Sequence, residues 1–204
     1  MPPSQAGVPP ETLVILAGGL GKRLGGVPKG LIRVDGVTVV ERLLELARGP
    51  VLLSANHPEW YEWLDVPVVG DAFGERGAPG GVVTALGAAA TEWVLVVGCD
   101  MPLVTRAMLD QLLARARPSI DVVCFERDGQ LEPLLGLYRR SLHEDWAARL
   151  EGQPSLKALI ESTSYETVQA AEPWRLASLN SPKDIESFRS CGASGTVRRQ
   201  VPTW

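Results

Sequence analysis

The sequence predicts an α/β fold, a three-layer sandwich in which helices cover both faces of a mainly parallel, Rossmann-like sheet. Two continuous apolar runs, 13–17 and 93–97, suit strands that are buried on both faces. Segments with helical spacing of apolar residues alternate with such runs over most of the chain. The 204 residues, of which 45% are hydrophobic and 22% charged, are enough for one domain with a buried core.

The other strands and helices are predicted from shorter apolar runs, from helical spacing of apolar residues and from capping residues. Further strands are predicted at 51–53, 66–69 and 121–125, with an extended segment at 133–138. An apolar stripe behind Thr38 predicts a helix at 38–48, and Thr105 is expected to cap another that runs to 117. The remaining helices are predicted at 58–64, 82–90, 142–150, 155–161 and 182–190.

The two ends differ in composition from this domain. Residues 1–11 are rich in proline and small side chains, and 191–204 carry turn-forming residues without an apolar period. We therefore expect a flexible N-terminal tail over 1–11, a single domain over 12–190 and a flexible C-terminal tail over 191–204.

Charge and cysteine usage exclude several classes of protein. The net charge of −4 gives no overall basic field for nucleic acid or membrane, and no apolar run approaches the length of a membrane span. The three cysteines are an odd number without metal-ligand spacing, which indicates reduced thiols. The first residues lack a signal-peptide layout. We expect a cytoplasmic protein without nucleic-acid or membrane partners.

A glycine-rich loop follows the first strand. Five of its residues before Lys29 are glycines, and Lys22, Arg23 and Lys29 are basic. Glycines let backbone N–H groups approach an anion closely, and the cations add charge against phosphate. Ligands bind at the carboxyl ends of strands in such sheets, so this loop predicts a phosphate site. Pro28 before the lysine excludes a P-loop, and Leu24 excludes a dinucleotide fingerprint.

A second strand end carries a carboxylate. The run 93–97 is followed by Gly98-Cys-Asp-Met-Pro102, which places Asp100 at the same edge of the sheet. Magnesium is usually held by one or two carboxylates together with substrate phosphates, so Asp100 is the predicted Mg²⁺ ligand. Asp110 and Glu92 are weaker candidates, since neither follows a strand. A purely structural Asp100 would cap the helix that begins after Thr105.

Together these motifs resemble those of a known family. The segment from Leu16 to Lys29 is similar to the nucleotidyltransferase signature Leu-Ala-Gly-Gly-x-x-x-Arg-Met-Gly-Gly-x-x-Lys, and the most similar family is molybdenum cofactor guanylyltransferase. The likeness runs from about 12 to 190 and includes Val69-Gly-Asp71, Gly77-Ala-Pro-Gly-Gly81 and Ser178-Leu-Asn-Ser-Pro-Lys-Asp184. It implies a sheet of the nucleotide-diphospho-sugar transferase type.

The resemblance also implies an activity and a set of residues. It implies transfer of GMP from GTP to molybdenum-molybdopterin with release of pyrophosphate, with Mg²⁺ as cofactor, and insertion or target-enzyme proteins as possible partners. The predicted catalytic residues are Arg23, Lys29 and Asp100. The predicted nucleotide-binding residues are Leu16, Ala17, Gly18, Gly19, Gly21, Lys29, Asn56, Asp71 and Asp100. The predicted acceptor-binding residues are Gly77, Gly81, Pro102, Ser178 and Asn180, and the predicted metal ligand is Asp100.

Three departures from the family pattern concern the acceptor more than the nucleotide. Ser178 replaces an asparagine, Pro28 replaces an acidic residue, and Glu132 stands where Gln-Pro is usual. Two alternatives stay open. One is another nucleotidyltransferase, either a molybdopterin cytidylyltransferase or an enzyme for sugar or alditol phosphates. The other is a GTP-binding adaptor without catalysis.

Overall fold

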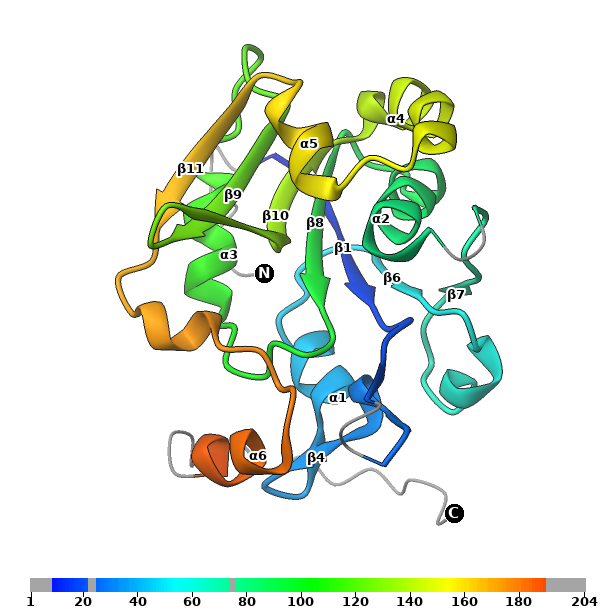
Figure 1. Ribbon diagram of the computed structural model, residues 1–204, viewed down its shortest axis with the longest axis vertical. Coiled ribbons are helices and arrows are strands. Elements are labelled where there is room, and N and C mark those ends of the chain that lie inside the picture. The colour runs from blue at the N-terminus through cyan, green and yellow to red at the C-terminus, as the bar shows by residue number, and fades with distance from the viewer. Residues whose placement is uncertain (1–8, 22–24, 74–75, 190–204) are drawn as a thin grey trace, which may run out of the picture.

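A seven-stranded sheet forms the centre of the computed structural model, which describes residues 9–21, 25–73 and 76–189 (Figure 1). The strand order is β11-β9-β10-β8-β1-β6-β7. The strands are β1 (Glu11–Leu16), β6 (Val51–Ser54), β7 (Val68–Val69), β8 (Trp93–Gly98), β9 (Val122–Arg127), β10 (Gln130–Arg139) and β11 (Tyr165–Gln169). Only β10 among them runs antiparallel to its neighbours β8 and β9. The predicted mainly parallel sheet is confirmed.

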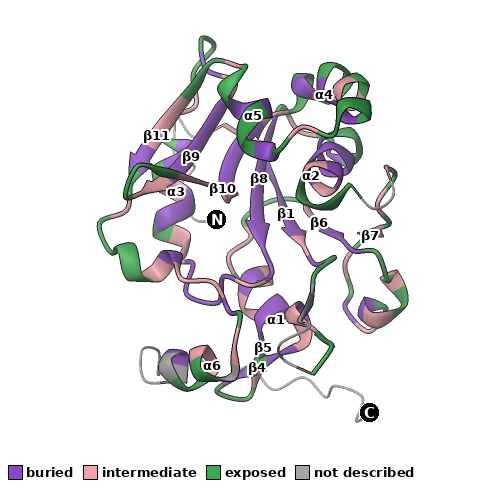
Figure 2. Ribbon diagram, in the orientation of Figure 1, coloured by how far each residue is buried: buried purple, intermediate pink, exposed green. Residues whose placement is uncertain are grey.

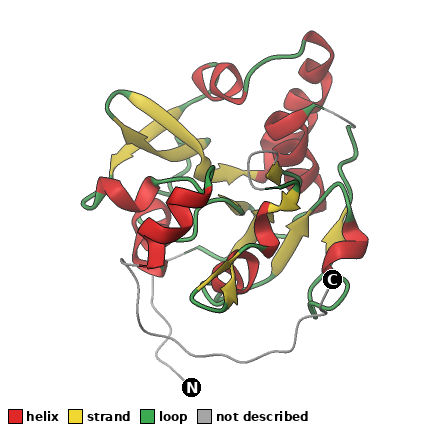
Figure 3. Ribbon diagram, turned by 60° about the horizontal axis from the view of Figure 1, so that its bottom comes forward, coloured by secondary structure: helices red, strands yellow, loops and turns green. Residues whose placement is uncertain are grey.

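Helices cover both faces of this sheet, as the turned view in Figure 3 shows. On one face lie α1 (Val39–Leu44), α3 (Arg106–Leu113) and α6 (Pro182–Arg189), and on the other α2 (Gly77–Ala88), α4 (His143–Arg149) and α5 (Leu156–Glu161). Alternate residues of β1 point to opposite faces, so Leu13 and Ile15 enter the first core and Val14 the second. Figure 2 shows the central strands buried between the two layers. The predicted three-layer fold is therefore confirmed.

Several predicted boundaries and one element were wrong. Helix α1 ends at Leu44 rather than 48, α3 ends at Leu113 rather than 117, and α2 begins at Gly77 rather than 82. The segment predicted as a helix at 58–64 is a 3-10 turn, η3 (Pro58–Tyr61). Strand β11 was not predicted. The other short elements are hairpins β2–β3 (Leu20–Gly21, Val27–Pro28) and β4–β5 (Arg33–Val34, Val37–Thr38), and turns η2 (Lys29–Leu31), η4 (Arg140–Leu142), η5 (Leu150–Gly152) and η6 (Pro173–Leu176).

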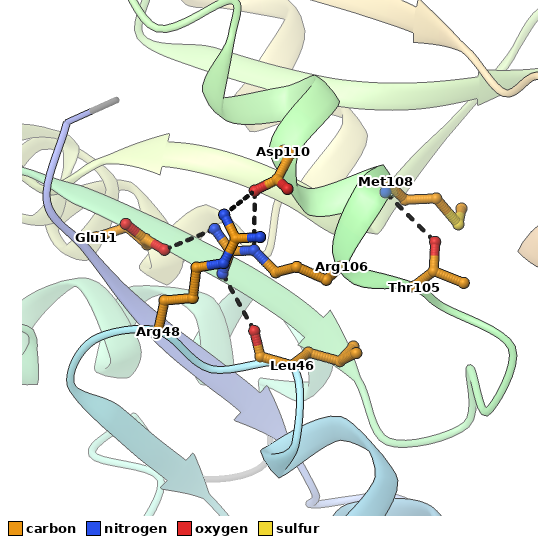
Figure 4. A network of polar contacts seen from close by, with 7 residues as sticks. All are labelled: Glu11, Leu46, Arg48, Thr105, Arg106, Met108 and Asp110. Atoms are coloured by element: carbon orange, nitrogen blue, oxygen red, sulfur yellow. Dashed lines mark hydrogen bonds and ion pairs between the residues drawn. The ribbon is translucent and has the colours of Figure 1, made fainter. Parts of the chain in front are cut away.

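The beginning of β1 is held by an arginine of α3. The Arg106 guanidinium donates hydrogen bonds to Glu11 at 2.9 Å, to Asp110 at 2.9 Å and to the carbonyl of Leu46 at 3.1 Å (Figure 4). Glu11 is the first residue of β1 and directly precedes residue 12, where the predicted domain begins. Asp110, the weaker candidate for a metal ligand, takes part in this network and in an ion pair with Arg48. The predicted tails otherwise fall largely on 1–8 and 190–204, outside the described residues.

Candidate active site

The candidate site is a cleft where β1 and β8 end side by side. The two strands are parallel neighbours, with Leu16 opposite Gly98, so the segments that follow them emerge at the same edge. A cavity of about 200 Å³ opens there. Its lining includes nine residues predicted from the sequence, namely Leu16, Gly18, Gly19, Lys29, Asn56, Asp71, Gly77, Gly81 and Asp100. It also includes five that were not predicted, Ser54, Ala78, Gly98, Cys99 and Leu134.

An ion pair crosses this cleft. The Lys29 Nζ lies 3.0 Å from Asp100 Oδ2, and the two side chains are only 17% and 19% exposed. Both groups were predicted to lie at one edge of the sheet, and they are in direct contact. A cation and a carboxylate that line the same cleft can act together on a phosphate and its counter-ion.

The glycine-rich loop brings Lys29 back to the end of β1. Hairpin β2–β3 reverses the chain, and the Lys29 N–H donates to the Gly19 carbonyl at 3.2 Å. Gly25 and Gly26 have φ angles of +79° and +80°, a conformation that side chains other than hydrogen disfavour. Arg23, a predicted catalytic residue, lies outside the described residues. Its contribution stays a prediction.

A buried tyrosine supports both arms of this loop. The Tyr61 hydroxyl donates to the Ala17 carbonyl at 3.3 Å, and a Cβ on Gly30 would lie 3.0 Å from that hydroxyl. Burial raises the pKa of Tyr61 well above its usual value, so the hydroxyl keeps its proton. No role was predicted for Tyr61. The only feature of the sequence that could have indicated Tyr61 is an aromatic residue in the segment between two strands.

Two predicted nucleotide-binding residues face Gly18 and the start of α2. A Cβ on Gly18 would lie 3.2 Å from Asn56 Oδ1, so the asparagine packs closely over the end of β1. Asp71 Oδ1 accepts hydrogen bonds from the Phe73 N–H at 2.9 Å and from the Thr84 hydroxyl at 3.3 Å. These bonds fix the carboxylate at the rim of the cleft.

Other predicted residues lie outside the lining of the cleft within the described part of the chain. Ala17 is 3% exposed, and its N–H donates to the Ser54 carbonyl at 2.7 Å. Gly21 pairs with Val27 in the β2–β3 hairpin, and Pro102 is buried. Ala17 therefore uses its backbone groups inside the fold. A direct contact of Ala17, Gly21 or Pro102 with a ligand stays a prediction.

The predicted acceptor segment contacts the backbone of Asp100 and the side chain of Lys29. The Leu179 N–H donates to the Asp100 carbonyl at 2.7 Å, and Lys29 Nζ donates to Asn180 Oδ1 at 2.7 Å. The Asn180 amide in turn donates to the Ser178 carbonyl at 3.4 Å. The predicted nucleotide and acceptor residues thus meet at the Lys29 ammonium.

Cys99, the neighbour of Asp100 in the lining of the cleft, keeps its proton. Burial, and then the charge of Asp100, raise the pKa of Cys99 to about 12, so the thiol stays protonated at neutral pH.

Glu92, the other weaker metal candidate, pairs with Arg139, and Glu132 pairs with Arg127 at 2.7 Å. No group of three or more His, Cys, Asp or Glu side chains within 9–21, 25–73 and 76–189 could hold a metal ion. None of the helices in these ranges is long and apolar enough to span a bilayer.

Gly98→Ala is expected to lower the turnover of the site about tenfold, because a misplaced reacting group costs rate steeply. The added Cβ would lie 2.9 Å from Asp100 Oδ1 and 3.3 Å from the Leu134 Cβ, so the carboxylate must move. Steady-state turnover, with circular dichroism to check the fold, measures this effect. Gly152→Ala is the control, since its Cβ meets nothing within 4 Å. Equal turnover in both variants would show that the carboxylate position is unimportant.

Comparison with known proteins matches most of the chain to one family. The family model described as "MobA-like NTP transferase domain" matches residues 13–168. A molybdenum cofactor guanylyltransferase of Pseudomonas putida (strain GB-1) is 34% identical over 189 residues, which cover 87% of this chain and 97% of that protein. One from Pseudomonas aeruginosa (strain PAO1) is 32% identical over 190 residues, covering 89% and 96%.

Solved structures agree with this fold. Molybdopterin-guanine dinucleotide biosynthesis protein A from Archaeoglobus fulgidus superposes with a TM-score of 0.76 at 20% identity, covering 88% of this chain and 97% of the other. A CMP:2-keto-3-deoxy-manno-octonic acid synthetase superposes with a TM-score of 0.68 at 12% identity, covering 89% and 98%. At these identities the likeness bears on the fold alone, which is of the nucleotide-diphospho-sugar transferase type.

Proposed function

Because the chain belongs to the family of MobA-like NTP transferases that includes the molybdenum cofactor guanylyltransferases, we propose that its cleft transfers GMP from GTP to molybdenum-molybdopterin, with release of pyrophosphate. The observation that carries this proposal is the 3.0 Å contact between Lys29 and Asp100 at the ends of two adjacent strands. The contact joins the two motifs that the reaction requires.

The reaction needs charge neutralisation and alignment rather than a general base. The terminal phosphate of the acceptor is already anionic at neutral pH. One of its oxygens forms a bond to the α-phosphorus of GTP, and the bond from that phosphorus to the bridging oxygen of pyrophosphate breaks. Lys29 would stabilise the negative charge that shifts toward the leaving pyrophosphate. The Gly18 and Gly19 backbones, which line the cleft, would supply further donors.

Nucleotidyltransferases generally use a divalent metal, and we propose Mg²⁺ on Asp100. Mg²⁺ prefers oxygen ligands and typically takes one or two carboxylates, with substrate phosphates and water completing its shell. The Asp100 carboxylate at the cleft fits this pattern, even though no group of three or more acidic, His or Cys side chains among the described residues could hold a metal ion. The bound ion would offset charge between the phosphates.

Fewer contacts support the assignment of the residues that bind the acceptor. We assign the molybdopterin phosphate to Gly77 and Gly81 in the lining of the cleft, and to the segment of Ser178 and Asn180, whose Asn180 side chain contacts the Lys29 ammonium. A cytoplasmic location and partners among insertion or target-enzyme proteins are what this function would imply. Both stay predictions.

A nucleotide panel tests the function. The purified protein is titrated with GTP, CTP, ATP and UTP in the presence of Mg²⁺, and pyrophosphate release is then measured with molybdopterin and with sugar phosphates. We expect preference for GTP and release with molybdopterin only. Preference for CTP or UTP would contradict the proposal. GTP binding without pyrophosphate from any acceptor would instead support a non-catalytic adaptor.

A further inference from the structure

Asp184 lies in the first turn of α6 and holds the backbone of the acceptor segment. Its Oδ2 accepts hydrogen bonds from the Asn180 N–H at 2.8 Å and the Ser181 N–H at 2.7 Å. The Asp184 N–H donates back to the Ser181 carbonyl at 3.1 Å. The bond to Ser181 is half of a capping box, but the bond to Asn180 reaches one residue further than a cap requires.

Asn180 is fixed from both sides and presents its side chain to Lys29. On one side the buried Leu179 is tied to the Asp100 carbonyl through its N–H, and on the other side Asp184 holds the Asn180 N–H. The side-chain oxygen Oδ1 of Asn180 then accepts a hydrogen bond from Lys29 Nζ at 2.7 Å. A single residue, Asn180, therefore connects the Asp184 carboxylate to the Lys29 ammonium.

Electrostatics agree with this chain of contacts. The pKa of Asp184 lies below its usual value, mainly because its carboxylate accepts the Asn180 N–H, and also because the Lys29 charge is near. Asp184 is thus ionised at neutral pH. The Lys29 ammonium accordingly has two direct acceptors, Asp100 and Asn180, and a second carboxylate, that of Asp184, close by.

We propose that Asp184 is a positioning residue for Lys29: it fixes Asn180, whose amide oxygen keeps the lysine ammonium beside Asp100. This inference rests on the proposed function, in which Lys29 acts on the triphosphate. It also gives the Asn180 side chain a task on the nucleotide side of the cleft, in addition to the predicted contact with the acceptor. The competing role for Asp184 is that of a helix cap with no effect on the site.

An NMR experiment on the unliganded protein separates these roles. The chain contains four lysines, Lys22, Lys29, Lys157 and Lys183, so the ¹⁵N-labelled ammonium signals can be assigned by single Lys→Arg variants. A held ammonium exchanges its hydrogens slowly with water. We expect a visible Lys29 signal in the wild type that is lost to exchange in Asp184→Ala. The matched control is Ser155→Ala. It removes the cap of α5, a hydrogen bond of 3.1 Å that the Ser155 hydroxyl accepts from the Ala158 N–H. Helix α5 packs on the face of the sheet opposite to α6.

Kinetics provide the second measurement. Asp184→Ala is expected to lower kcat about tenfold with a smaller change in KM for GTP, because a displaced group acts mainly on the transition state. Asn180→Ala keeps the bond from the Ser181 N–H to Asp184 that caps α6. This variant must lose both the Lys29 signal and turnover, and it tests the inference even if Asp184→Ala does not fold. Adding Asp184→Ala to Asn180→Ala should cost little more, as expected for two residues that act in series.

Two results would overturn the inference. One is a retained Lys29 signal in either Asp184→Ala or Asn180→Ala. The other is loss of signal and turnover in Ser155→Ala as well, which would indicate a general effect of losing a helix cap. Because the NMR measurement needs no substrate, its outcome is independent of the proposed function, which the nucleotide panel and the release of pyrophosphate test separately.

Discussion

Replacement of Lys29 by alanine is expected to lower turnover at least about 100-fold, the scale found when one donor to a transition state is removed. Among the described residues that line the cleft, Lys29 carries the only positive charge. Its Nζ lies 3.0 Å from Asp100 Oδ2 and 2.7 Å from Asn180 Oδ1. Alanine removes the charge needed near the leaving pyrophosphate and leaves Asp100 without its partner. Lys29→Arg is expected to recover only part of the loss, since a guanidinium has a different reach and shape.

The measurement is kcat and KM for GTP at saturating acceptor, together with thermal unfolding. Lys157→Ala serves as the control, because that lysine is half exposed and pairs with Glu161 at 3.7 Å on α5, on the opposite face of the sheet from α6. It should keep wild-type turnover. If Lys29→Ala also turned over GTP at the wild-type rate, Lys29 could not be the residue that stabilises the phosphates.

Asp100→Asn is expected to abolish metal-dependent turnover, a loss of at least about 1,000-fold. Asparagine has nearly the same shape, so the backbone bond from Leu179 to the carbonyl of residue 100 should persist. What is lost is the negative charge that a hard divalent cation requires. The fold should therefore remain while the metal no longer binds at this position.

The effect is measured as turnover against Mg²⁺ concentration, with Mn²⁺ binding followed by electron paramagnetic resonance in the presence of GTP. Asp145→Asn is the matched control, since Asp145 is exposed and pairs with Arg149 at 3.4 Å on α4. An Asp100→Asn variant with an unchanged metal dependence would place the metal site elsewhere in the chain.

The fold was predictable where burial is continuous and was missed where it is partial. Strands β1 and β8 are buried along nearly their whole length, and their uninterrupted apolar runs indicate this directly. Strand β11 lies at the edge of the sheet with only Val168 buried, so Tyr165-Glu-Thr-Val-Gln169 has no clear apolar pattern. The first turn of α2, Gly77-Ala-Pro-Gly-Gly81, has the composition of a loop although it is helical.

The site was predictable where parallel strands converge. Lys29 and Asp100 both follow buried strands, and adjacent parallel strands bring their ends together. The contact between Lys29 and Asn180 joins positions 151 residues apart, and no local pattern encodes such a pairing. Leu134 enters the cleft from a register irregularity in β10, which depends on how two strands pair rather than on local sequence.

The most direct test of the central claim is a crystal structure of the protein with GTP and Mg²⁺ in the absence of an acceptor. We predict electron density for the metal against the Asp100 carboxylate and for the triphosphate within hydrogen-bond distance of Lys29 Nζ. A triphosphate bound away from the ends of β1 and β8, with the Lys29–Asp100 pair intact, would contradict the account.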